Sequence, residues 1–114
     1  MEHVRIFAVL GFDEESYMTA YSVREAATYV AREYLIPVDV TCVHVNLADA
    51  EELRRLGVPT VVVGERVVSW GYAPLPHEVV DAVFREVTKR LEEMERVGGR
   101  GSVPWPSAAA RPGR

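Results

Sequence analysis

Cysteine is nearly absent from this sequence. Its 114 residues include one cysteine, Cys42, and three histidines that are scattered along the chain. One cysteine cannot close an internal disulfide or form a Cys-x-x-Cys redox pair, and a zinc site built on it would need help from distant histidines. The sequence therefore predicts no disulfide scaffold, no dithiol redox centre, no metal site and no cofactor.

Long hydrophobic runs are missing as well. No apolar stretch approaches the roughly 18 to 20 uncharged residues that a membrane-spanning helix needs, and residues 1–5 lack the basic-then-apolar layout of a signal peptide. We therefore expect a cytoplasmic protein without a membrane partner. With 114 residues, 48% of them hydrophobic, the chain has the size of one domain with one core.

Basic residues are scarce over most of the chain. Residues 1–95 hold all 17 acidic side chains and nine of the 13 basic ones, a net charge of −8, whereas residues 96–114 hold four arginines and no acid. Such an acidic body lacks the dense basic face that neutralises phosphates, so no nucleic-acid partner is expected. After Arg96 the sequence is rich in Gly, Pro and Ala without periodicity. We predict one domain over residues 1–96 and a flexible basic tail over residues 97–114.

Hydrophobic periodicity predicts four strands and three helices. The strands are expected over residues 4–10, 38–45, 60–63 and 66–70, and the helices over residues 14–34, 49–56 and from Pro76 onward. The apolar residues at helical spacing on the first helix are Tyr17, Met18, Tyr21, Ala27, Val30, Ala31 and Tyr34. The predicted inward face of the last helix is Val79, Val80, Val83, Phe84, Val87 and Leu91.

The order of these elements is βαβ, α, ββ, α. A βαβ crossover makes its two strands parallel, and the tight turn at Gly64-Glu65 joins the last two strands as an antiparallel hairpin. The predicted fold class is therefore α/β, with a four-stranded mixed sheet and helices on both faces.

One segment resembles a known superfamily. Residues 57–72 read Gly-Val-Pro-Thr-Val-Val-Val-Gly-Glu-Arg-Val-Val-Ser-Trp-Gly-Tyr, and an amphipathic helix follows. This stretch is similar to the C-terminal half of thioredoxins and glutaredoxins, and the likeness covers about residues 4–92 because the βαβ half has the same order. The resemblance implies a thioredoxin-like fold in which Val-Pro-Thr opens the third strand with a cis proline. The Val58-Pro59 bond is therefore predicted to be cis.

The sequence departs from the redox members of that superfamily at the start of the first helix. Those proteins carry Cys-x-x-Cys or Cys-x-x-Ser there, because a helix N-terminus lowers the pKa of a thiol. The equivalent spacing here is Ser16-x-x-Thr19, preceded by the acidic run Asp13-Glu14-Glu15. Hydroxyl groups cannot exchange disulfides, so the resemblance implies a member without redox activity.

Cys42 does not replace the missing pair in this interpretation. It lies in the middle of an apolar strand, where a free cysteine is most often a small buried side chain, and burial raises the pKa of a thiol. His44 shares its face by the period of two, which is more typical of a packed side chain than of half a metal site. We therefore predict a buried, unreactive Cys42.

The predicted function is that of a binding or assembly module for a protein or peptide. The resemblance implies that the chain has the peptide-facing groove of the thioredoxin-like fold but lacks the cysteine thiols of the redox members. No catalytic residue is assigned. Backbone groups beside a cis proline are expected to pair with an extended partner strand. The predicted groove residues are Ser16, Tyr17, Thr19, Val58, Pro59, Thr60, Trp70, Gly71 and Tyr72.

Two alternatives stay open. In the first, Ser16 or Tyr17 serves a small glutathione- or thiol-handling enzyme, since glutathione transferases resemble this fold and use a Ser or Tyr near the first helix. Against it stands a plainer expectation, that Ser16 caps a turn and Tyr17 packs inward. In the second, the chain is a homodimeric structural protein that buries the same groove against a second copy.

Overall fold

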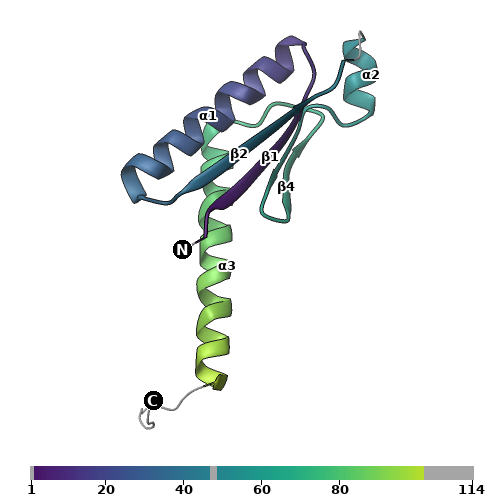
Figure 1. Ribbon diagram of the computed structural model, residues 1–114. Helices are drawn as coiled ribbons and strands as arrows, with labels where there is room; N and C mark the ends of the chain where they lie inside the picture. Colours follow the sequence, from purple (N-terminus) through teal and green to yellow (C-terminus); the bar gives the residue numbers. More distant parts are fainter. Residues whose placement is uncertain (1, 47–48, 102–114) are drawn as a thin grey trace.

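The structure is a computed structural model, and it describes residues 2–46 and 49–101. The predicted order of βαβ, α, ββ, α is confirmed in these residues (Figure 1). The strands are β1 (Val4–Leu10), β2 (Val38–His44), β3 (Thr60–Val63) and β4 (Arg66–Trp70). The helices are α1 (Glu14–Tyr34), α2 (Ala50–Arg55) and α3 (Pro76–Gly101).

The sheet is mixed, as predicted, and its strand order is β2-β1-β3-β4. β1 lies in the middle, where it pairs parallel with β2 and antiparallel with β3. β3 and β4 form the expected antiparallel hairpin. Gly64 adopts a φ of 62° in the turn between them, a left-handed conformation that glycine accepts without steric cost.

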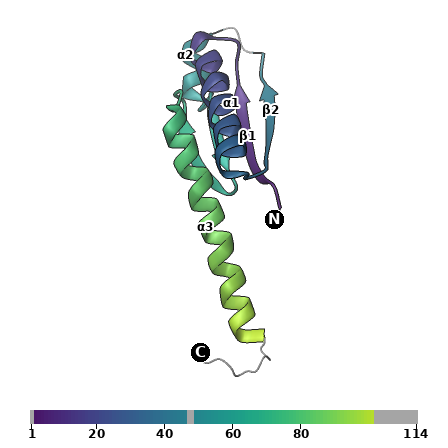
Figure 2. The ribbon, with the colours of Figure 1, turned by 90° about the vertical axis from the view of Figure 1, so that its left-hand side faces the viewer.

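Both long helices lie on the same face of the sheet, side by side (Figure 2). α1 packs on β1 and β2, and α3 packs on β1, β3 and β4. The expectation of helices on both faces is therefore wrong. The remaining helix, α2, lies beyond the ends of the strands (Figure 1), and of its residues 51–55 Leu53 is the one that is buried. A helix of six residues, of which Leu53 is the one large apolar residue, has too little apolar surface to cover a sheet.

The core fills the space between this sheet face and the two long helices. From β1 it takes the alternate side chains, Val4, Ile6, Ala8 and Leu10. The buried side of α1 consists of small residues, namely Ser16, Thr19, Ser22, Val23, Ala26 and Val30. The larger apolar residues Tyr17, Met18, Tyr21 and Tyr34 are exposed. The expectation that Tyr17 packs inward is wrong, because the small residues allow α1 to approach the sheet closely and turn the tyrosines outward.

α3 runs well past the rest of the body (Figures 1 and 2). It ends at Gly101, so residues 97–101 continue the helix, and the predicted domain end at residue 96 falls inside it. Val79 and Val83 are buried as expected, but Leu91 is 52% exposed because α3 has left the sheet at that point. The remainder of the predicted tail, residues 102–114, lies outside the described residues.

None of the helices described in residues 2–46 and 49–101 is both long enough and apolar enough to cross a membrane.

Candidate functional site

The three segments of the predicted groove do meet at one end of the sheet. The Val58-Pro59 peptide bond is cis, as predicted. Gly71 N–H donates to the Pro59 carbonyl oxygen at 2.7 Å, and Ala73 N–H donates to Glu15 Oε2 at 2.9 Å. The start of α1, the loop before β3 and the turn after β4 are thus joined by hydrogen bonds.

The two hydroxyl groups at the thiol positions are buried inside this junction. Ser16 is 1% exposed and Thr19 is 0% exposed. Ser16 Oγ accepts from Gly11 N–H at 2.8 Å, so it closes the turn before α1 as expected. Thr19 Oγ1 donates to the Glu15 carbonyl oxygen at 2.9 Å. Neither hydroxyl group faces solvent, so neither reaches a ligand in this arrangement.

The backbone beside Pro59 is also occupied. Val58 is buried, and its N–H donates to the Leu53 carbonyl oxygen at 2.8 Å. The hydroxyl group of Thr60 donates to the Gly57 carbonyl oxygen. The Val58 donor and the Pro59 acceptor therefore already have partners within the chain, contrary to the expectation that the backbone beside Pro59 presents unpaired groups to a partner strand.

Of the nine predicted groove residues, Tyr17, Trp70 and Tyr72 have exposed side chains, with Tyr17 at 64%. Trp70 lies over Gly57, whose φ is 84° and whose missing Cβ makes room for the indole ring. Two clefts of the described structure, of about 690 and 380 Å³, are lined by other residues. The junction is therefore a closed corner flanked by aromatic side chains.

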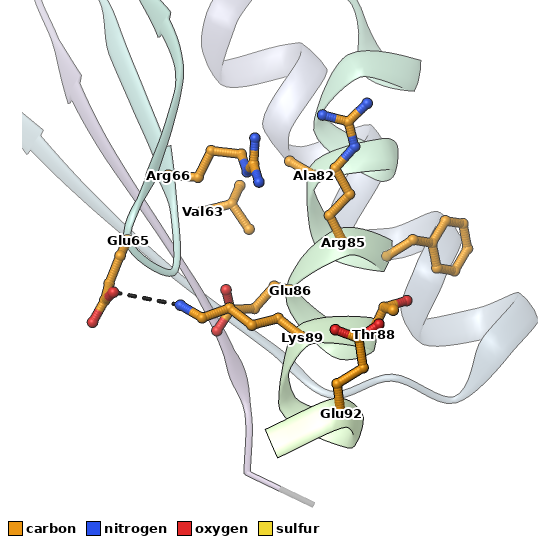
Figure 3. Close-up of a pocket in the computed structure, with 10 residues that line it drawn as sticks. Val63, Glu65, Arg66, Ala82, Arg85, Glu86, Thr88, Lys89 and Glu92 are labelled. Carbon is orange, nitrogen blue, oxygen red and sulfur yellow. Dashed lines mark hydrogen bonds and ion pairs between the residues drawn. The ribbon is translucent and has the colours of Figure 1, made fainter. Parts of the chain in front are cut away.

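The larger cleft lies between the β3–β4 hairpin and α3 and has a volume of about 690 Å³ (Figure 3). Its charges balance each other. Lys89 Nζ lies 3.5 Å from Glu65 Oε1, and Arg90 Nε lies 3.1 Å from Glu86 Oε2. A smaller cleft of about 380 Å³ shares Arg66, Ala82 and Arg85 with it and adds Glu78 and Asp81. This mixture selects neither anions nor cations, and neither cleft is lined by a cysteine or serine nucleophile.

Cys42 is exposed, so the prediction that it is buried is wrong. The reason is the position of β2, which forms an edge of the sheet and leaves all seven of its residues at least partly exposed. The ring of His44 stacks on Phe12 with centroids 5.3 Å apart. No group of three His, Cys, Asp or Glu side chains that could hold a metal ion occurs in the described part of the chain.

The outer edge of β2 is open. Val4 N–H donates to the Pro37 carbonyl oxygen at 2.9 Å, and Val45 N–H donates to the Leu10 carbonyl oxygen at 2.8 Å. In a parallel ladder the N–H and C=O of one residue point the same way, and the direction alternates along the strand. Odd-numbered residues of β2 therefore face β1. The N–H and C=O groups of Val38, Val40, Cys42 and His44 face outward, and within the described residues β2 pairs with β1 alone.

The opposite edge of the sheet is less open. The pairing of β4 with β3 shifts between Val61 and Val62, which leaves Val68 as a bulge, and the Tyr72 hydroxyl group lies 3.4 Å from the Val68 carbonyl oxygen. Bulges and occupied carbonyl groups protect a sheet edge from pairing. β2 has seven residues in unbroken register with β1. Of the two edges, β2 is the one suited to receive another strand.

An apolar surface adjoins the open edge. The sheet face that no described helix covers carries Phe7, Val43 and Val67, each at least 41% exposed, and Trp70 at its end. The charged residues on this face are Arg5 and Asp39, which are neighbours across β1 and β2. A mostly apolar exposed face of this kind is a common mark of an interaction surface.

We expect amide hydrogen exchange to alternate along β2 in the free chain. The outward N–H groups of Val40 and Cys42 should exchange orders of magnitude faster than those of Thr41 and Val43, because only the latter are hydrogen-bonded in the ladder. Exchange measured residue by residue by NMR checks this. Uniform protection along β2 would contradict the open edge.

The sequence contained a sign of this edge that periodicity alone did not reveal. Residues 38–44 include Asp39, Thr41, Cys42 and His44, whereas the strand at residues 4–10 has Arg5 as its one polar side chain. A strand with polar groups on both faces fits an edge better than the centre of a sheet.

Comparisons of the chain with protein-family models, with curated proteins and with solved structures found no match.

Proposed function

We propose that this chain is a redox-inactive protein of the thioredoxin-like superfamily that binds an extended segment of a partner protein along the edge of β2. The superfamily assignment draws support from the element order and from the place of Val58-Pro59-Thr60 at the start of β3. The lack of redox function draws support from Ser16 and Thr19 at the thiol positions. The observation that carries the binding function is the open, unbroken edge of β2.

An added strand would make the sheet five-stranded. Its backbone would bond to the outward groups of Val38, Val40, Cys42 and His44, which supplies affinity without regard to sequence. Its side chains would alternate between the α1 side and the uncovered face, where Val43 and Phe7 are exposed. Binding would therefore combine edge pairing with contacts to an apolar surface that the chain itself leaves open.

The alternatives lack a comparable observation. The Ser16 hydroxyl group is buried and bonded to Gly11, and the Tyr17 side chain is exposed at the start of α1, so the two side chains do not form an assembled centre for a thiol-handling enzyme. A homodimer through the predicted groove would meet a closed corner in which Val58 and Pro59 are buried.

Proline at residue 40 tests the role of the edge. We expect Val40→Pro to weaken binding of peptides selected from a displayed random library by about tenfold or more, since it removes an outward N–H that those peptides would use. The Val40 N–H does not bond β1, so the fold should survive. Val40→Ala keeps this N–H and serves as the matched control. Equal binding to both variants, with native circular dichroism, would refute pairing at β2.

A further inference from the structure

The chemistry of the partner strand can be inferred from the side chains beside the edge, on the assumption that the proposed function is right. β2 has one residue with a formal charge at neutral pH, Asp39. The parallel register places Asp39 opposite Arg5, hence on the uncovered face with Phe7 and Val9. Its side chain is 59% exposed.

The Asp39 carboxylate is only partly engaged. Its Oδ1 lies 2.8 Å from His3 Nδ1, and the His3 side chain is itself 54% exposed. Arg5 is its neighbour across the ladder, but no ion pair joins the two side chains among the described residues. The carboxylate therefore has capacity for a further cationic partner on its outer side, where the added strand would lie.

Along the same face, Asp39 is followed by Thr41 and then by Val43, so the edge presents a charged, a polar and an apolar side chain in turn. On the α1 side the series is Val38, Val40, Cys42 and His44. Directly opposite residues of neighbouring strands share a face and interact, with opposite charges favourable and like charges unfavourable. The body of the chain, net −8 over residues 1–95, adds a longer-range attraction for basic segments.

We infer that the partner is a basic β-strand, added antiparallel to β2, with Lys or Arg opposite Asp39, apolar residues opposite Val40 and Val43, and a hydroxyl side chain opposite Thr41. Antiparallel pairing is chosen because it is slightly more stable per residue than parallel pairing. Charge complementarity at Asp39 sets the register, since a shift by one residue would move the cation to the α1 side.

Two synthetic peptides test this inference. One reads Gly-Val-Val-Thr-Val-Lys-Val-Arg-Gly, acetylated and amidated, and the other replaces Lys and Arg with Glu. Titration of the full chain, followed by NMR shifts of the β2 amides, should show the basic peptide binding about fivefold more tightly at low salt. High salt should reduce this difference, because Asp39 is exposed.

Variants at Asp39 test whether the preference for the basic peptide comes from the Asp39 carboxylate. Asp39→Asn should reduce the discrimination between the peptides to the part that comes from the charge of the body, and Asp39→Lys should reduce it further or reverse it, while Glu25→Gln on α1 serves as the control that should leave it nearly unchanged. Both Asp39 variants are at an exposed position and should fold normally. An undiminished preference for the basic peptide in Asp39→Lys would overturn the inference.

The outcomes separate this inference from the proposed function. If both peptides bind equally and Val40→Pro abolishes both, the charge inference fails while edge binding stands. If neither peptide binds and the displayed library also selects nothing at β2, the proposed function fails with it. Concentration-dependent protection of the outward amides in the free chain would mean that a second copy occupies the edge, which overturns the basic partner.

Discussion

Gly57→Ala is expected to lower the free energy of unfolding by about 2–4 kcal/mol. Gly57 has a φ of 84°, where an L-residue with a Cβ costs about 1–2 kcal/mol. An added methyl group would also run into the Trp70 indole ring, which lies over this residue. At about 4–8 °C per kcal/mol for a domain of this size, the thermal midpoint should fall by at least about 8 °C. Thermal unfolding followed by circular dichroism measures it.

Gly64→Ala is the matched control for this prediction. Gly64 also has a positive φ, of 62°, but the atoms nearest to an added Cβ belong to the end of the Glu86 side chain, which can move. Gly64→Ala should therefore lower the free energy of unfolding by the backbone cost alone, about 1–2 kcal/mol. Trp70→Ala should relieve part of the cost of Gly57→Ala when the two are combined. A loss for Gly57→Ala no larger than for Gly64→Ala would show that the indole ring is not a constraint.

Ser16→Ala is expected to cost about 1–3 kcal/mol of unfolding free energy, because it leaves the buried Gly11 N–H without an acceptor. The corresponding fall in the thermal midpoint is about 4 °C or more. A thiol-exchange role would make the same residue matter for activity, whereas the structure makes it matter for stability. Chemical denaturation measures the loss of stability. The midpoint should fall while the m-value stays unchanged.

Thr19→Val is the control for Ser16→Ala. It also removes a buried hydroxyl group, but it leaves the acceptor of the Gly11 N–H in place. The Thr19 hydroxyl donates to the Glu15 carbonyl oxygen, four residues earlier in the same helix. Bonds of this kind contribute little to helix stability, so Thr19→Val should cost clearly less than Ser16→Ala. Equal losses for the two variants would contradict the assigned role of the Gly11 bond.

The secondary structure could be predicted because its signals are local. Alternation in residues 4–10 and the Gly64-Glu65 turn are visible within a few residues, and β1 and the β3–β4 hairpin lie where expected. The arrangement of layers was not visible in this way. Whether α2 covers the second face depends on its apolar area, and a helix of six residues with Leu53 as its one large apolar residue has too little.

The candidate site was harder to predict for a related reason. Spacing alone placed Ser16 at the thiol position, but its burial follows from its bond to Gly11 and from the close packing of α1. Likewise, the Val58 N–H is unavailable because it donates to the Leu53 carbonyl oxygen, a bond that no sequence pattern reveals. The edge position of Cys42 follows from the strand order, and a strand near the middle of the chain is not necessarily in the middle of the sheet.

The part of α3 that extends past the body has a practical consequence for attaching this protein to a surface or a label. From Leu91 to Gly101 the helix continues at about 1.5 Å per residue, which amounts to a rigid spacer of roughly 16 Å. Just before this stretch, Arg90 of α3 donates to the Glu2 and His3 carbonyl oxygens of the body. A tether joined at the distal end of this helix would therefore keep the domain away from the attached surface or label and leave the sheet accessible.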